Sequence, residues 1–151
     1  MRFEVSIFVE STWKGPARRR GVAMWIVECK RNGVPVTREG LIRLEDGTEN
    51  MANLMAITAA AGILTKECSI RVFTQCDHIL NTMQNHWHIT WQKNEWHNAK
   101  GKPVKNAELW SGMLESLGKH MYSVHGGWHE YQNLMQGKIR KELEEWKNTE
   151  Q

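Results

Sequence analysis

The sequence predicts an α/β domain, with five strands and four helices in the order βββαβα, a basic aromatic segment, and then αβα. Three observations support this fold class: polar and apolar residues alternate at the N-terminus, an Asn-Gly pair separates two further strand-like runs, and later segments have apolar residues at helical spacing. The 151 residues, 40% of them hydrophobic, can bury one core but not two. We therefore expect a single domain over residues 1–151, without internal repeats.

Three strands form the first predicted unit, an antiparallel meander. The first strand ends at Glu10, after a run in which apolar residues alternate with mostly polar ones. After a loop come strands at 21–30 and 36–44. Asn32-Gly33 falls between these two strands, and Asn-Gly is a strong hairpin signal because both residues accept the positive φ of a tight turn.

The next predicted element is a long helix that follows Asp46-Gly47, has Asn50 as its N-cap and extends to Gly62. Small and apolar residues dominate this helix, so it can pack closely on a sheet. The chain then continues with five further elements: a strand at 69–74, a helix at 76–83, a helix at 106–117, a strand at 120–124 and a helix at 132–147.

Charge and cysteine content narrow the functional classes. The 20 Lys and Arg residues against 17 Asp and Glu residues give a net charge of only +3, so any nucleic-acid argument must rest on local clusters. The three cysteines lack C-x-x-C spacing, which argues against a disulfide framework and against a structural zinc site. No stretch has the apolar length of a signal peptide or a membrane span. We expect a cytoplasmic protein without a membrane partner.

Two sequence strings carry a resemblance to a known family. Residues 48–56 read Thr-Glu-Asn-Met-Ala-Asn-Leu-Met-Ala, and residues 102–110 read Lys-Pro-Val-Lys-Asn-Ala-Glu-Leu-Trp. Both strings, together with the order of the elements, resemble the ribonuclease H family in its type 1 cellular branch. The basic, tryptophan-containing segment at about 84–105 is similar to the handle of that family. The resemblance covers nearly the whole chain and implies a ribonuclease H-like fold, a mixed five-stranded sheet flanked by helices.

The same resemblance bears on catalysis, because the family uses four carboxylates to hold two Mg²⁺ ions for phosphodiester hydrolysis. It places the four positions at Glu10, Asn53, Gln75 and Gly137. Only the first is acidic. A neutral amide gives up the charge attraction that offsets the dehydration of Mg²⁺, and glycine offers no side-chain ligand. We therefore expect no catalytic residue and no cofactor, with Glu10 at most a single metal ligand and Mg²⁺ or Mn²⁺ relevant only to residual nuclease activity.

Simpler explanations of these residues stay open. Glu10 at a strand end can be a solvated carboxylate, and Asn53 can bond to the free backbone N–H groups of its helix start. Gly137 within a helix costs about 1 kcal/mol relative to alanine, which close packing or an approaching partner would explain. Asp77 and Glu49 lie near the lost positions and are candidates to replace them, although Asp77 also suits the first turn of a helix.

Binding can survive the loss of cleavage, because the family grips RNA–DNA hybrid largely through sugars and phosphates. The candidate contacts are a cationic loop, one polar helix residue and the handle lysines: Lys14, Arg18, Arg19, Arg20, Asn50, Lys93, Lys100, Lys102 and Lys105. The arginine loop also fits an ordinary solvated turn. Glu49 stands where the family has a neutral Asn and would repel a nearby phosphate. The handle tryptophans Trp87, Trp91 and Trp96 suit packing better than base stacking.

The histidines of the later loop receive no catalytic role. The family carries a histidine on a mobile loop, and that position falls on Gly127, with His125 and His129 as neighbours rather than matches. Without cysteine or carboxylate companions at ligand spacing, zinc is not expected either.

Three functional hypotheses follow. The leading one is a catalytically inactive ribonuclease H-like protein that binds RNA–DNA hybrid or double-stranded RNA. The alternative is a protein–protein interaction module whose former active-site face contacts another protein, with Trp128 and Tyr131 as anchors. The third is a weak metal-dependent hybrid ribonuclease that needs Glu10. The sequence leaves the oligomeric state open.

Overall fold

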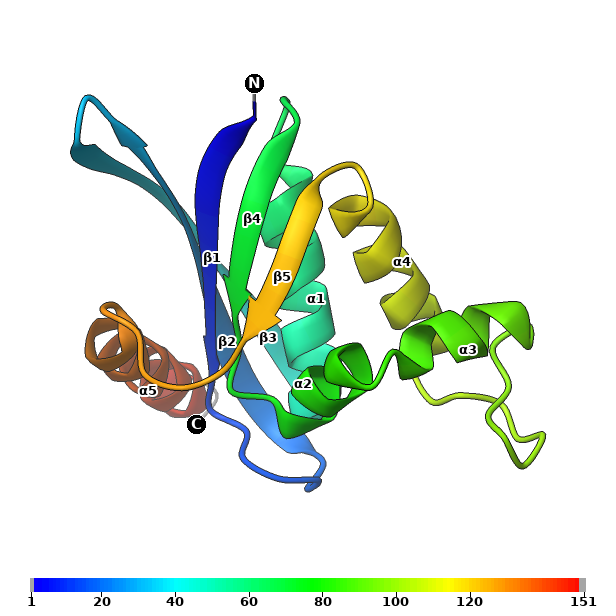
Figure 1. Ribbon diagram of the computed structural model, residues 1–151. Helices are drawn as coiled ribbons and strands as arrows, with labels where there is room; N and C mark the ends of the chain where they lie inside the picture. Colours follow the sequence, from blue (N-terminus) through cyan, green and yellow to red (C-terminus); the bar gives the residue numbers. More distant parts are fainter. Residues whose placement is uncertain (1, 150–151) are drawn as a thin grey trace.

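The computed structural model describes residues 2–149 and contains the five predicted strands and one helix more than the four predicted (Figure 1). The elements are β1 (Phe3–Ser11), β2 (Arg19–Arg31), β3 (Val34–Gly47), α1 (Glu49–Gly62), β4 (Cys68–Phe73), α2 (Asp77–Gln84), α3 (Trp87–Lys93), α4 (Ala107–Leu117), β5 (Met121–His125) and α5 (Gln132–Thr149). The additional helix is α3, which lies in the handle segment.

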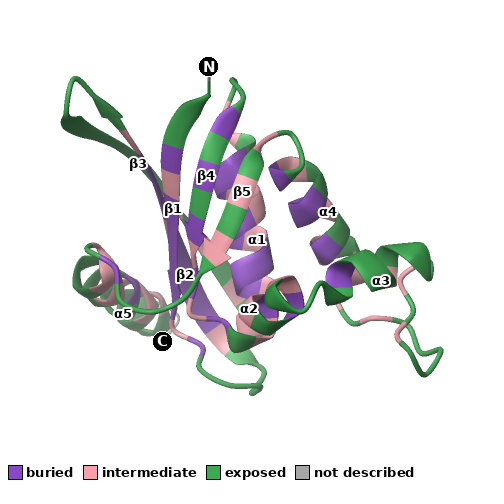
Figure 2. Ribbon diagram, viewed as in Figure 1, coloured by how far each residue is buried: buried purple, intermediate pink, exposed green. Residues whose placement is uncertain are grey.

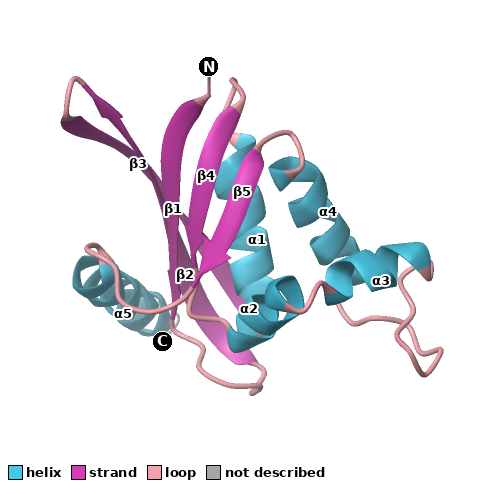
Figure 3. Ribbon diagram, in the orientation of Figure 1, coloured by secondary structure: helices cyan, strands magenta, loops and turns pink. Residues whose placement is uncertain are grey.

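One mixed sheet in the order β3-β2-β1-β4-β5 organises the chain (Figure 3). β1, β2 and β3 pair antiparallel, and the predicted turn has Asn32 at φ 53° and Gly33 at φ 79°. β4 and β5 add parallel to β1. This topology confirms the ribonuclease H-like fold class. It also brings the carboxyl ends of β1, β4 and β5 to one edge of the sheet, where ligand sites of such sheets form.

The second strand is longer than the sequence predicted, and this changes the position of two arginines. β2 begins at Arg19, which pairs with Gly47 of β3, and a register shift separates Arg19 from Gly21. Arg19 and Arg20 therefore belong to the sheet and not to the preceding loop. The apolar pattern missed this extension because it reports side chains only. The first residues of β2 are arginines, which join the sheet through backbone pairing.

The start of α1 also differs from the prediction. Thr48 is the N-cap, and its hydroxyl accepts a hydrogen bond from the backbone N–H of Met51 at 3.3 Å. Asn50 is the second residue of the helix, so its assignment as N-cap is wrong. A threonine at the cap satisfies one of the free N–H groups of the first turn. The Asn50 side chain lines the neighbouring cavity, and its Oδ1 accepts a hydrogen bond from the Cys76 thiol at 3.1 Å.

The two faces of the sheet are covered unequally. On one face, α1 and α4 enclose the larger core, which includes Ile7, Leu54 and Trp110. On the other face, α5 packs on β1 and β2 through Met135 and Ile139. Figure 2 shows buried segments concentrated where α1 and α5 cover the sheet, and exposed segments along β4 and β5. The outer face of β4 and β5 is thus more open to solvent than that of β1 and β2, on which α5 packs.

The handle docks on the domain through aromatic side chains. Trp91 meets Trp110 edge-on with ring centroids 5.7 Å apart, and His78 of α2 lies 5.9 Å from the same indole. Trp91 and Trp96 both pack against the larger core, as expected for packing residues, whereas Trp87 is 44% exposed. Within residues 2–149, none of the helices combines the length and apolar character that a bilayer crossing demands.

Candidate functional site

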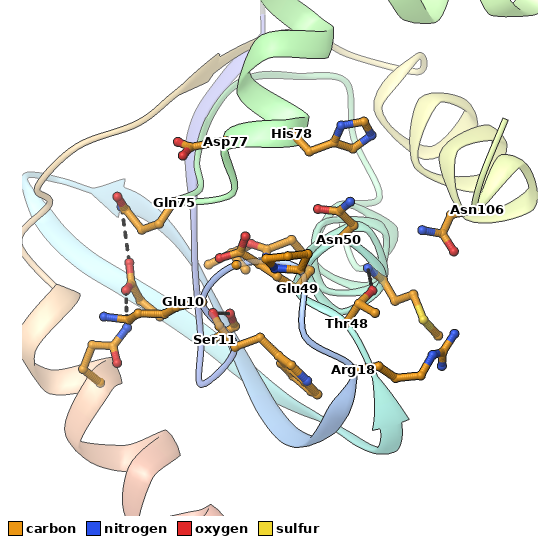
Figure 4. A pocket seen from close by; sticks show the side chains of 18 of the residues that line it. Glu10, Ser11, Arg18, Thr48, Glu49, Asn50, Gln75, Asp77, His78 and Asn106 are labelled. Atoms are coloured by element: carbon orange, nitrogen blue, oxygen red, sulfur yellow. Dashed lines mark hydrogen bonds between the residues drawn. The ribbon is translucent and has the colours of Figure 1, made fainter. Parts of the chain in front are cut away.

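A cavity of about 1140 Å³ opens at the carboxyl edge of the sheet (Figure 4). Its walls come from the end of β1, the loop between β1 and β2, the start of α1, the segment between β4 and α2, the loop before α4, and α5. Segments that are far apart in the sequence therefore meet here because the parallel strands β1 and β4 end side by side. Three of the four predicted carboxylate positions, Glu10, Asn53 and Gln75, line this cavity.

Glu10 is buried and fully engaged by neighbouring side chains. It is 1% exposed, and Gln136 Nε2 donates to its Oε1 at 2.6 Å. His129 Nε2 lies 2.8 Å from the other oxygen, and Gln75 Nε2 makes a longer contact of 3.4 Å to that oxygen. Because the backbone N–H of Tyr131 donates to His129 Nδ1, the imidazole carries its proton on Nε2 and donates it to Glu10. The expectation of a solvated Glu10 is wrong.

Asn53 is equally satisfied. Its side chain is 2% exposed; Nδ2 donates to the Glu49 carbonyl at 2.9 Å, and Oδ1 accepts from the Thr74 hydroxyl at 2.7 Å. The predicted bonds to free N–H groups do not form, because Oδ1, the only acceptor of the amide, faces the Thr74 hydroxyl after β4, while Nδ2 donates to a carbonyl of α1. Asn53 thereby connects α1 to the end of β4, a structural role that a carboxylate could fill only in part, since it has no N–H to donate.

The fourth predicted position, Gly137, lies on α5 outside the cavity, whereas its neighbour in the sequence faces Glu10. Gly137 does not line the cavity, and a Cβ added to it would meet nothing within 4 Å. Gln136, one position earlier, lines the cavity and contacts Glu10. Successive helix residues point about 100° apart, so only one of the two can face β1. We call Glu10, Asn53, Gln75 and Gln136 the cavity floor.

The floor does not suit two Mg²⁺ ions. Its one carboxylate already accepts three hydrogen bonds, and the other three side chains are amides. Glu49 and Asp77 also line the cavity; burial raises the pKa of Glu49, and the charge of Asp77 raises it further. Among residues 2–149, no group of three or more His, Cys, Asp or Glu side chains is placed to hold a metal ion. Asp77 lies in the first turn of α2, as predicted.

Cationic side chains surround the cavity and form what we call the cavity rim: Lys14, Arg18, Lys105 and Arg140. All four are exposed. Arg18 also donates to the Asp46 carbonyl at 2.8 Å and lies 3.4 Å from the Asp46 carboxylate. The amides of Asn50 and Asn106 face the same space. Asn106 and Arg140 were not predicted as site residues. The sequence signals that could have indicated them are an asparagine at the start of a helix and an arginine one helical turn after Gln136.

Two predicted contact residues point elsewhere. Arg19 donates to the Thr12 carbonyl at 3.0 Å. Arg20 forms an ion pair with Glu45 and covers the Trp146 ring of α5, with its guanidinium carbon 4.7 Å from the ring centroid. Neither lines the cavity, because both belong to β2. Arg19 and Arg20 therefore belong to a strand and not to a solvated turn, and their contact with nucleic acid stays a prediction.

Of the four predicted handle lysines, one lines the cavity and three do not. Lys105 lines the cavity, whereas Lys93, Lys100 and Lys102 are exposed outside its lining. The backbone N–H groups of Lys100 and Lys102 both donate to Asn98 Oδ1, at 2.9 and 3.0 Å, which shapes the handle loop. These three lysines stay predicted contacts for a ligand that extends beyond the cavity.

The loop between β5 and α5 is tied to the site. Gln75 donates to the Gly127 carbonyl at 2.8 Å, and His129, 4% exposed, binds Glu10. No role was predicted for His129, because its partner Glu10 lies 119 positions away in the sequence. Tyr131 donates to the buried Glu28 carboxylate, which raises the pKa of Tyr131 to about 12. The two predicted protein anchors thus differ: Tyr131 is half-buried with its hydroxyl bonded inside the chain, whereas Trp128 is 74% exposed.

Comparison with known proteins places this site in a family. The ribonuclease H family model matches residues 4–128. The chain belongs to the ribonuclease H family. A ribonuclease H of Nitratidesulfovibrio vulgaris is 30% identical over 122 residues, which cover 81% of this chain and 75% of that protein. A ribonuclease H of Lachnoclostridium phytofermentans is 27% identical over 118 residues, with coverages of 78% and 75%. The family match ends before α5, the helix that carries the fourth predicted position.

Solved ribonuclease H structures share the fold. LC9-RNase H1, a type 1 RNase H with the type 2 active-site motif, superposes with a TM-score of 0.71 at 19% identity, covering 86% of this chain and 65% of that chain. The N-terminal RNase H domain of a Mycobacterium tuberculosis protein also gives 0.71, at 10% identity and with 99% of both chains covered. The foamy viral protease-reverse transcriptase in complex with dsDNA gives 0.66 at 15% identity, with 93% of both chains covered. At these identities the likeness concerns the fold alone.

Proposed function

We propose that this ribonuclease H family member is catalytically inactive and binds nucleic acid, RNA–DNA hybrid or double-stranded RNA, in its cavity. One observation carries the first half of the proposal: the floor retains a single carboxylate, and that carboxylate is buried under hydrogen bonds from His129, Gln136 and Gln75. A metal ion would have to displace these donors and would gain only one negative charge. No cofactor is needed for binding.

The cavity rim supports the second half. Lys14, Arg18, Lys105 and Arg140 give a local positive charge that the net charge of +3 conceals, and phosphates are attracted to such clusters. Asn50 and Asn106 add amide donors and acceptors suited to sugar hydroxyls and base edges. The foamy viral protease-reverse transcriptase, whose structures share this fold, has been solved in complex with RNA/DNA hybrid and in complex with dsDNA.

The test is fluorescence anisotropy of a labelled RNA–DNA hybrid titrated with the protein, without Mg²⁺, at two salt concentrations and with duplex DNA as competitor. We expect salt-sensitive binding that duplex DNA displaces poorly. Replacing Lys14 and Lys105 by Gln should weaken binding and lower the salt slope by about 2, one for each lost phosphate contact. The matched control replaces Lys30 and Lys119, two exposed lysines outside the cavity lining, and should leave the slope unchanged.

Absence of binding at low salt would overturn the proposal and favour the protein-interaction alternative, for which the exposed Trp128 is the supporting observation. Its removal by Trp128→Ala would then abolish capture of the partner. A cytoplasmic location belongs to the same proposal, supported by the three free cysteines Cys29, Cys68 and Cys76.

A weak metal-dependent hybrid ribonuclease is the second candidate. Glu49 and Asp77 favour it, because they line the cavity close enough for the charge of one to raise the pKa of the other. Family membership points the same way. The candidate predicts cleavage of labelled hybrid with Mg²⁺ or Mn²⁺ that disappears in both Glu10→Ala and Glu49→Gln. Cleavage that survives both substitutions would come from a contaminant, and intact hybrid at high protein concentration would exclude the candidate.

A further inference from the structure

The outer face of β4 and β5 is a second surface with side chains suited to nucleic acid. α5 packs mainly on β1 and β2, so no helix within the described residues covers the face beyond it (Figures 1 and 2). Residues of β4 and β5 that point to the opposite face, such as Val72 and Val124, belong to the larger core. Their neighbours Arg71 and His125 are exposed, and Phe73 is half-buried.

Strand register aligns three rings across this face. Phe8 of β1 pairs with Phe73 of β4, which pairs with His125 of β5. The Phe8 and Phe73 rings are stacked with centroids 5.1 Å apart, and the Phe73 and His125 rings follow at 5.4 Å with an interplanar angle of 31°. Phe8 is 4% exposed beneath Tyr131 and His129, whereas the row becomes progressively open toward β5. The two outer rings therefore form an accessible aromatic surface.

A cation and two hydroxyls lie next to the rings. Arg71 precedes Phe73 on the same face, with its guanidinium carbon 5.9 Å from the ring centroid. In register, Arg71 lies between Ser6 and Ser123, and the Ser123 hydroxyl bonds to His125 Nε2 at 2.7 Å. No carboxylate within residues 2–149 pairs with Arg71, and Glu4 lies one row farther toward the amino end of the face.

We propose that this platform, defined as Arg71, Phe73, Ser123 and His125, binds single-stranded nucleic acid. The inference rests on the proposed function only in taking the ligand to be nucleic acid. Unpaired bases stack on exposed rings, and guanidinium groups bind phosphates, without need for a particular sequence. Paired bases are hidden inside a duplex and cannot reach a row of rings on a sheet, so the platform selects a single strand.

Continuity with the cavity supports this occupant over a peptide. Gln75, at the cavity floor, lies two residues beyond Phe73, roughly 7 Å along extended chain. Gln75 also binds the Gly127 carbonyl in the loop that carries the exposed Trp128. A duplex at the cavity rim could therefore extend its single-stranded overhang onto the platform, where the unpaired cation Arg71 complements the phosphate charge.

The experiment compares three labelled ligands by anisotropy: a ten-nucleotide oligo(U), a blunt RNA–DNA hybrid, and the same hybrid with a ten-nucleotide overhang. The double variant Arg71→Gln, His125→Ala should weaken oligo(U) binding by about tenfold, the loss of roughly one stacked base and one phosphate contact. It should remove the advantage of the overhang over the blunt hybrid and leave the blunt hybrid unchanged. The matched control Arg38→Gln removes one exposed arginine of β3 and should change none of the three.

Each outcome separates this inference from the proposed function. Oligo(U) binding that is absent, or equal in wild type and the double variant, overturns the platform while hybrid binding can stand. Loss of blunt-hybrid binding together with oligo(U) binding would also overturn it, because the variant would then weaken nucleic-acid binding in general, through the lost positive charge. Oligo(U) binding that is lost in the variant, with no hybrid binding in wild type, would support the platform and overturn the hybrid proposal. Both residues are exposed, so the variants should keep the fold.

Discussion

The cavity floor and the cavity rim differ in how far the protein itself satisfies their polar groups. On the floor, Glu10 and Asn53 are buried and every hydrogen bond of their side chains goes to another part of the chain. On the rim, Lys14 and Lys105 extend into solvent. A buried charge without a partner costs several kcal/mol, whereas an exposed one costs almost nothing to keep. A floor with one carboxylate and a rim with four cations is the arrangement that the proposed function, binding without cleavage, requires.

The largest effect should come from removing the acceptor at the centre of the floor. Glu10→Ala leaves His129 and Gln136 buried without their partner, which should lower the free energy of unfolding by about 3 kcal/mol. Urea unfolding measures it. Glu4→Ala, on the same face of β1 but exposed, is the control and should change stability by less than about 0.5 kcal/mol. Equal stability of the two variants would mean that Glu10 is free to bind metal, and the contrast between floor and rim would disappear.

Adding negative charge to the cavity floor should make the stability of the protein depend on Mg²⁺. The triple variant Asn53→Asp, Gln75→Glu, Gln136→Glu changes only amides into acids of the same shape. We expect it to be less stable than wild type without metal, because four carboxylates then repel one another, and to regain about 2 to 3 kcal/mol in Mg²⁺ at a hundredfold excess over Kd. Thermal unfolding with and without Mg²⁺ measures the difference. A Mg²⁺-dependent rise in the Tm of wild type would contradict the proposal that the floor binds no metal.

Glu28 is a second buried carboxylate and, unlike Glu10, does not line the cavity. It therefore shows what a buried carboxylate contributes to stability away from the site. Tyr131→Phe leaves Glu28 without its donor and should cost about 1 to 2 kcal/mol at neutral pH. The pKa of Tyr131 is raised to about 12 from a usual value of 10, so its contribution is complete below pH 10 and is lost as the pH rises from 10 through 12. The gap between wild type and variant should therefore close across that interval.

Unfolding by urea at neutral pH and at pH 11 tests this expectation. Tyr122→Phe is the control at neutral pH only, because no hydrogen bond of its hydroxyl occurs within residues 2–149, and burial, which raises the pKa of Tyr122, makes its own contribution pH-dependent as well. A gap that stays constant with pH would show that the Glu28 contact does not involve the Tyr131 proton. Hybrid binding should be equal in all three proteins, since Glu28 and Tyr131 do not line the cavity.

Local patterns sufficed for the fold, whereas the site needed long-range information. Alternation, the Asn-Gly turn and helical spacing report how neighbouring residues are arranged, and the strands and long helices followed them. The partner of Glu10 depends on which residue of α5 faces β1, a matter of helix rotation that packing of Met135 and Ile139 decides. Arg20 was misplaced for a similar reason, because its partner Trp146 lies at the far end of the chain. Sequence spacing alone carries no information on such pairs.

The smallest predicted effect tests the rotation of α5 directly. Gly137→Ala adds a methyl group that meets nothing within 4 Å and removes the conformational freedom of a helical glycine, so it should raise stability by about 0.5 to 1 kcal/mol. Hybrid affinity should stay the same, because the helix presents Gln136 and not Gly137 to Glu10. Gln136→Ala is the matched change one position earlier, and it should lower stability by removing a donor to a buried carboxylate. If Gly137→Ala weakened binding while Gln136→Ala did not, α5 would be rotated by one residue, and the floor would contain a gap where an amide now closes it.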